Sequence, residues 1–282
     1  MDKAGSVPPS PLLHPVIAPV AVALGLAAML QTGRLAPALG LRPTLIACEL
    51  ALGLPALALL VVPAVRGAMG ARAVGGLTLL AAAVSGGALW AASLGLLELQ
   101  YTLWTPPPGY LQQFMGLHEA LRPHGPLDLA FSVAAIALAP AVCEELLFRG
   151  LALAALSSAV SRGSAVILSS ALFAIIHLDF SGSGPTLYRV PFAMAVGVGF
   201  ALLRLRTGSL LPSMLAHAVV NTTTFLAALQ EQPTGPLPDP RPALGAALLL
   251  GGLAAFVAVF RHLPRAESGA GNPARLETTP GR

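Results

Sequence analysis

Three short groups of polar residues interrupt otherwise apolar stretches of the sequence. The first lies in APAVCEELLFRG, residues 139–150, and contains Glu144, Glu145 and Arg149. On a helix, adjacent side chains diverge by about 100°, whereas residues four apart share a face. We therefore expect Arg149 to neutralise Glu145 in a structural ion pair, leaving Glu144 free for general-base chemistry. Taken alone, the same residues also fit a purely structural clamp between helices.

The second and third groups are pairs of residues one helical turn apart. Phe173 and His177 share the stretch ALFAIIHLDF, and His217 and Asn221 share SLLPSMLAHAVVNTTTFLAAL. An imidazole and a carboxamide on one helical face can donate hydrogen bonds to a developing oxyanion. The alternatives are a hydrogen-bonded core histidine at 177 and, for the other pair, polar contacts that hold helices together.

The remaining polar residues in apolar stretches are given structural roles. Glu49, in LIACELALGL, stands near the start of a span, where it can reach the interface or pair with Arg42, so we place it outside the site. His118 is interpreted as an interface residue. Only Cys48 and Cys143 occur, both in apolar segments, which excludes a disulfide framework and a paired-cysteine metal site.

The composition indicates an integral membrane protein. The chain is 55% apolar and only 10% charged, with a mean hydropathy of +0.77, whereas soluble domains carry roughly 25% charged residues. Its net charge of +4 comes from arginines scattered singly between apolar runs. This distribution is typical of the positive-inside rule and argues against a nucleic-acid partner.

The pattern predicts an all-α, polytopic transmembrane bundle of about eight spans. The segment 110–121 is amphipathic, and either lies on the membrane surface or belongs to a proline-stiffened connector. We divide the chain into N-terminal helices and loop (1–127), a core that carries the three polar groups (128–230), a last span (231–262) and a disordered tail (263–282). The predicted helices are 14–31, 44–65, 74–97, 128–158, 163–178, 188–206, 209–230 and 242–261.

Charge bias predicts that both termini are cytoplasmic. The Ala, Leu, Gly, Pro and Arg richness is typical of a GC-rich bacterium, which points to the bacterial inner membrane. The connections predicted to be cytoplasmic carry Arg66, Arg72, Arg162, Arg204, Arg206, Arg261 and Arg265.

Together, the three groups resemble the motifs of one family. Glu-Glu-x-x-x-Arg at 144–149, Phe-x-x-x-His at 173–177 and His-x-x-x-Asn at 217–221 match, in order and spacing, the motifs of the CPBP intramembrane proteases. That family includes the type II CAAX prenyl endopeptidases, the Abi proteins and bacteriocin-processing proteins. The resemblance covers roughly residues 128–230. It implies an eight-helix bundle with a cavity open to the cytoplasmic side.

The resemblance also implies hydrolysis of a peptide bond near the membrane-adjacent terminus of a protein or peptide. Glu144, helped by His177, would activate water, and His217 and Asn221 would bind the oxyanion. Glu145, Arg149 and Phe173 would support them.

Two alternatives remain open. Glu144, His177 and His217 could in principle hold zinc, but no HExxH pair fixes two ligands on one helix, and we favour a mechanism without a cofactor. A non-catalytic immunity factor, scaffold or transporter could also keep these buried groups. The lipid bilayer is the second expected partner, and the oligomeric state is not predicted.

Overall fold

The described part of the chain is built of helices alone. The computed structural model describes residues 13–106, 109–178, 187–230 and 239–266, so the predicted disordered tail lies outside it from residue 267 on. The elements are α1 (Ile17–Gly33), α2 (Ala36–Leu39), α3 (Leu41–Leu59), α4 (Pro63–Met69), α5 (Gly76–Leu103), α6 (Tyr110–Ala120), α7 (Pro126–Val133), η2 (Ala134–Leu138), α8 (Ala139–Glu145), η3 (Leu146–Ala152), α9 (Leu153–Ser157), α10 (Arg162–Ile175), α11 (Val190–Thr207), α12 (Leu210–Ala228) and α13 (Pro242–His262).

Eight apolar helical segments correspond to the predicted spans. Among the described residues, six are long and apolar enough to cross a membrane, and the apolar helices α1 and α10 are shorter. In the most apolar window of α13 only 17% of the residues are buried inside the protein. Because such a surface is unfavourable in water, α13 is expected to face lipid. The fold class and the approximate number of spans predicted from the sequence are confirmed.

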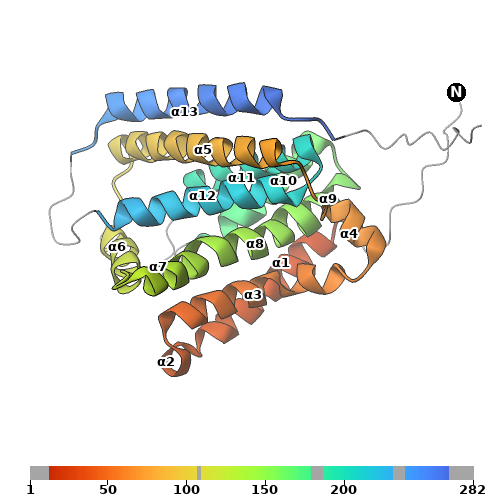
Figure 1. Cartoon of the computed structure of the whole chain (residues 1–282), viewed down its shortest axis with the longest axis horizontal. Helices are drawn as coiled ribbons and strands as arrows, with labels where there is room; N and C mark the ends of the chain where they lie inside the picture. Colours follow the sequence, from red (N-terminus) through yellow and green to blue (C-terminus); the bar gives the residue numbers. More distant parts are fainter. Residues whose placement is uncertain (1–12, 107–108, 179–186, 231–238, 267–282) are drawn as a thin grey trace, which may run out of the picture.

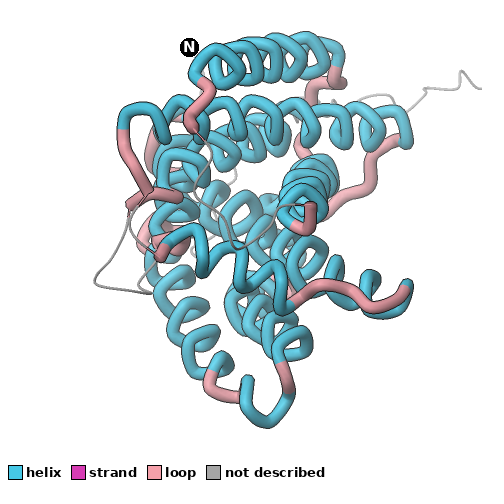
Figure 2. The backbone as a smooth tube through the Cα atoms, turned by 90° about the vertical axis from the view of Figure 1, so that its left-hand side faces the viewer, coloured by secondary structure: helices cyan, strands magenta, loops and turns pink. Residues whose placement is uncertain are grey.

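The bundle is layered around one long helix that runs from residue 126 to residue 157 (Figure 1). On one side of it lie α1 and α3, which pack against each other. On the other side lie α12 and the pair α10 and α11. Helix α5 lies between α12 and the outermost helix, α13. The tube drawn in Figure 2 shows the same helices from one end of the bundle.

The long helix departs from regular α-helical geometry on both sides of α8. The residues at the junctions between its stretches have right-handed helical backbone angles, but the wider π-helical stretches η2 and η3 flank α8. Pro140 near the start of α8 lacks a backbone N–H and so cannot make the usual bond to the preceding turn. Such π-helical turns occur frequently at functional sites. Here they enclose the segment that ends in Glu144 and Glu145.

A glycine sets the distance between α5 and α12. A Cβ atom on Gly86 would lie 2.6 Å from the backbone oxygen of Ala216, closer than real Cβ atoms come. The absent side chain therefore allows the two helices to touch. This contact fixes the part of α12 that carries His217.

Three differences between the structure and the sequence-based expectations bear on the elements around the site. The predicted span 44–65 breaks after α3, because Val62 is extended and Pro63 begins the separate helix α4. The segment 110–121 is the helix α6 and not merely a proline-stiffened connector. Helix α10 ends at Ile175, so His177 lies in the turn after it and not within a helix as predicted.

Candidate active site

The charged residues of the long helix form the buried ion pair predicted from their spacing. Nη1 of Arg149 lies 2.9 Å from Oε1 of Glu145, and neither side chain is exposed. The two residues are one turn apart, so the contact forms within a single helix even though η3 is π-helical. The buried guanidinium charge is thus compensated by a carboxylate, as a charge removed from water requires.

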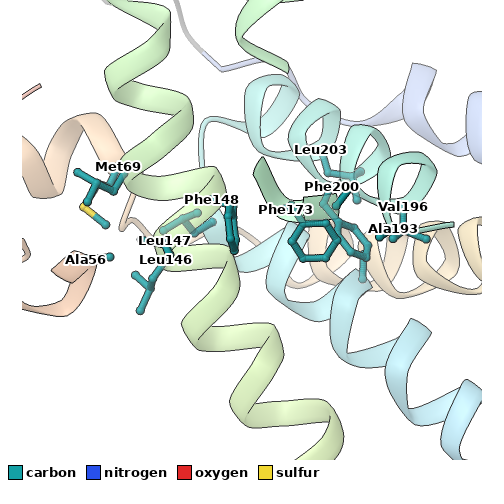
Figure 3. Packing of buried hydrophobic residues seen from close by; sticks show 14 of the residues in the cluster. Ala56, Met69, Leu146, Leu147, Phe148, Phe173, Ala193, Val196, Phe200 and Leu203 are labelled. Carbon is teal, nitrogen blue, oxygen red and sulfur yellow. The ribbon is translucent and has the colours of Figure 1, made fainter. Parts of the chain in front are cut away.

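Aromatic rings hold the rest of the Arg149 guanidinium. Its central carbon lies 4.2 Å from the ring centroid of Phe173 and 5.4 Å from that of Phe200, within the range of cation–π attraction. Figure 3 shows Phe148, Phe173 and Phe200 gathered between the long helix and its neighbours. Gly197 makes room for the group, because a Cβ there would lie 3.0 Å from Nη2 of Arg149. Phe173 thus supports the arginine directly.

The imidazole of His217 lies between the two carboxylates. Its Nδ1 is 3.2 Å from Oε1 of Glu145, and its Nε2 is 3.7 Å from Oε2 of Glu144. Because an ionised carboxylate only accepts hydrogen bonds, Nδ1 is the donor to Glu145. The ring also stacks on Phe200 at 4.7 Å between centroids, with the planes 19° apart. His217 is therefore held in one orientation, with Nε2 directed at Glu144.

His177 keeps its link to Phe173 although it lies beyond the end of α10. Its Nδ1 is 2.8 Å from the backbone oxygen of Phe173, and the two rings are 4.6 Å apart. A carbonyl oxygen accepts hydrogen bonds, so Nδ1 carries a proton and the neutral ring has its lone pair on Nε2. The orientation of the imidazole is thus fixed without a helical backbone.

Three of the four expected catalytic residues line one cavity. It has a volume of about 440 Å³ and includes Glu144, His177 and Asn221 in its walls. His217 is not in the wall but lies behind Glu144, whose Oε2 it approaches. The cavity is further lined by Met29, Leu45, Glu49, Tyr110, Gln113, Phe114, Leu117, His118, Ala135, Ile136, Pro140, Ile176, Leu178, Arg189 and Thr224.

One comparison with known proteins identifies the segment that carries these residues. Residues 126–223 match the family model described as type II CAAX prenyl endopeptidase Rce1-like. This segment is an Rce1-like domain. It begins with α7 and ends within α12, so it contains all seven residues singled out from the sequence. The match supports an intramembrane peptidase of the CAAX type. No curated protein and no solved structure matches the chain.

Three acidic or basic residues of the cavity wall, Glu49, His118 and Arg189, were not placed in the site by sequence reasoning. Glu49 does not pair with Arg42, which instead bonds the hydroxyl of Ser132 through Nε and lies 3.9 Å from Asp128. The Glu49 side chain faces the same cavity as Glu144, and its Oε2 is buried with no hydrogen-bond partner in the described structure. Its position in an apolar run was a usable signal, because such a charge is costly in a span. Our assignment to the interface was wrong.

Arg189 and His118 come from outside the polar motifs. Arg189 is the N-cap of α11 and brings a positive charge to the cavity. His118 in α6 is only 4% exposed, and its Nδ1 is 2.6 Å from the backbone oxygen of Phe114. Its assignment as an interface residue does not describe this position. Neither residue carried a sequence signal, because α6 and α11 meet only in the folded chain.

The candidate zinc ligands do not converge in a metal-binding arrangement. Across the residues with described positions, no group of three His, Cys, Asp or Glu side chains could hold a metal ion. Nδ1 of His217 is engaged by Glu145, and Nδ1 of His177 by a backbone carbonyl. These contacts leave Nε2 of each ring available and are compatible with metal ligation, but Glu144, His177 and His217 form no metal-binding group among the described residues.

Proposed function

We propose that this protein is an intramembrane endopeptidase in which Glu144 activates the attacking water. The observation that carries the proposal is the common cavity of Glu144, His177 and Asn221 within the Rce1-like domain. The substrate is a membrane protein or membrane-associated peptide, cleaved near its membrane-adjacent terminus.

The proton inventory of peptide hydrolysis assigns a role to each residue. Glu144 takes a proton from water, which His177 helps to orient through Nε2. The water oxygen attacks the carbonyl carbon, and the side-chain amide of Asn221 donates a hydrogen bond to the oxyanion. Glu144 then returns its proton to the leaving nitrogen as the C–N bond breaks.

His217 lies behind Glu144 and outside the cavity wall, so it would act as a second stabiliser of the oxyanion only if the Glu144 carboxylate moved aside. Because Nδ1 donates to Glu145, Nε2 can donate only when the imidazole is protonated. Protonated His217 and Arg149 would together carry two positive charges, which balance the two negative charges of Glu144 and Glu145. The buried set is then electrically neutral before water is deprotonated, and Glu145 and Arg149 act as positioning residues.

The mechanism uses no metal, because each imidazole already has a role without one. The test is to measure zinc in the purified, active protein and to assay cleavage after chelation. We expect less than one tenth of an equivalent of zinc and unchanged cleavage. Stoichiometric zinc whose removal and return switch cleavage off and on would overturn the metal-free mechanism but leave the peptidase function standing.

We further propose that the chain lies in the bacterial inner membrane with both termini in the cytoplasm. The described ends of the chain lie at one end of the bundle, where the Ser158 hydroxyl bonds the Leu13 carbonyl and the Ala266 amide bonds the Arg206 carbonyl. This end carries the arginines that the positive-inside rule assigns to the cytoplasm.

The cavity then opens away from the cytoplasm. Its walls come from the opposite end of the bundle, where α1 and α10 end and where α3 and α11 begin. We therefore propose cytoplasmic termini with a cavity that opens to the other side, in place of the cytoplasmic opening that the family resemblance implies. The charge distribution favours cytoplasmic termini and access of the substrate from the other side.

A comparison of cellular protein termini tests the function itself. Membrane-protein termini are mapped in the wild-type strain, in a deletion strain and in the deletion strain complemented with His177→Ala. We expect a small set of termini that appear only in the wild type. Identical termini in all three strains, with the variant stably inserted, would support a non-catalytic role.

A further inference from the structure

A second, larger cavity lies at the opposite end of the bundle from Glu144. Its volume is about 720 Å³, and it is formed where α9, α10 and α11 meet the segment after α13. No aspartate or glutamate is found among its described lining residues. Five arginines contribute to its walls: Arg149, Arg162, Arg204, Arg206 and Arg265.

Two of these guanidinium groups are held in place by backbone carbonyls. Arg204 donates from Nε to the Met69 carbonyl at 3.0 Å and from Nη2 to the Ala68 carbonyl at 2.8 Å. Arg206 donates in the same way to Leu263 at 3.0 Å and to Arg261 at 2.9 Å. Each guanidinium has five N–H groups, so three remain on each for another acceptor.

The charge of this end is not balanced by carboxylates of the described residues. It carries seven arginines (Arg66, Arg72, Arg162, Arg204, Arg206, Arg261 and Arg265) and no described acidic side chain. The other end mixes both signs, as in the pairs Arg122–Glu119 at 2.7 Å and Arg241–Glu98 at 3.0 Å. The positive-inside rule explains why arginines gather at this end, but not why several line one hollow.

We propose that this pocket binds a phosphate-bearing anionic group, of the kind carried by an anionic phospholipid. Guanidinium groups bind phosphate oxygens in pairs of parallel hydrogen bonds, which the preorganised Arg204 and Arg206 can supply. Arg162 and Arg265, both exposed, add charge at the rim. Basic pockets between transmembrane helices at the membrane face are suited to lipid headgroups.

The test uses the full-length protein in detergent and in nanodiscs, with Arg162→Gln and Arg265→Gln combined in one variant. These two exposed residues are chosen because substitution of Arg204 would remove its hydrogen bonds to the Met69 and Ala68 carbonyls of α4 and so destabilise the fold. Arg66→Gln is the matched control, because Arg66 is exposed at the same end but does not line the pocket. Binding of phosphatidylglycerol, diacylglycerol and inorganic phosphate is measured by native mass spectrometry and by titration.

We expect phosphatidylglycerol to bind the wild type and diacylglycerol not to. Each lost arginine should weaken binding roughly fivefold, so the double variant should lose about 25-fold while Arg66→Gln loses less than twofold. Equal or tighter binding of inorganic phosphate would support the site but assign it to a soluble phosphate compound. Equal binding of phosphatidylglycerol by the double variant and Arg66→Gln would overturn the proposal. Absence of binding of both phosphatidylglycerol and inorganic phosphate to the wild type would also overturn it.

Discussion

Oε1 of Glu145 lies 3.2 Å from Nδ1 of His217, and this contact joins the long helix to α12. The same oxygen pairs with Arg149, so one buried carboxylate restrains both an arginine and a histidine. Glu145 is thereby occupied, whereas the adjacent Glu144 lines the cavity. The two carboxylates are expected to respond differently to mutation.

Glu145→Gln should destabilise the protein as well as inactivate it. The substitution leaves the buried guanidinium of Arg149 without its countercharge, which typically costs about 3–5 kcal/mol. The free energy of unfolding in mild detergent measures the effect. Glu119→Gln is the control, because its ion pair with Arg122 is partly exposed and should be worth no more than about 1 kcal/mol. Equal losses for the two variants would mean that Glu145 does not hold Arg149.

Gly197→Ala should displace Arg149 without changing any polar group. The added methyl would lie 3.0 Å from Nη2 of the guanidinium, so the arginine or α11 must shift. We expect at least a tenfold loss of cleavage rate, because His217 is held through Glu145, the partner of Arg149. The matched control is Gly87→Ala in α5, where a Cβ meets nothing within 4 Å. Unchanged activity in Gly197→Ala would show that the Arg149 guanidinium can shift without disturbing Glu145 and His217.

Acidification should destabilise α6 through protonation of His118. Burial lowers the pKa of His118 below its usual 6.5, and Arg189 adds to this effect, while the hydrogen bond to Phe114 opposes it. A lowered pKa means that the unfolded form binds the proton more readily, so stability is retained above about pH 6.5 and lost below it, by at most about 1.4 kcal/mol per pH unit.

Amide hydrogen exchange of α6 between pH 7.5 and pH 5 measures this loss. Exchange should accelerate on acidification in the wild type and change less in His118→Gln, after correction for intrinsic rates. The same pH dependence in both proteins would assign it to another group.

The orientation of the bundle predicts which side labels a single cysteine. In a background without Cys48 and Cys143, a cysteine at exposed position 124, between α6 and α7, should react with an impermeant maleimide in spheroplasts. A cysteine at exposed position 67 in α4 should react only after permeabilisation. The reverse pattern would place the cavity on the cytoplasmic side.

Local patterns in the sequence were sufficient for most of the fold. Hydropathy located the spans, and the four-residue spacing found the ion pair of Glu145 and Arg149 because both residues lie on one helix. The break between α3 and α4 was missed because the hydrophobic run continues through Leu60–Val62.

The parts of the site that depend on packing between helices could not be read in this way. Glu49 and Glu144 are far apart in sequence, and only the packing of α3 against α8 brings them to one cavity. The contact between His217 and Glu145 likewise requires α12 to approach the long helix. Spacing alone could not separate a residue in the cavity wall from one behind it.

Cleavage by Glu144→Gln tests the central claim most directly. The substitution keeps the volume of the side chain but removes the base. The amount of the cleaved termini seen in the wild type should therefore fall at least about a thousandfold, while the protein remains folded and inserted. Wild-type levels of the same termini in a stably inserted Glu144→Gln variant would contradict the account.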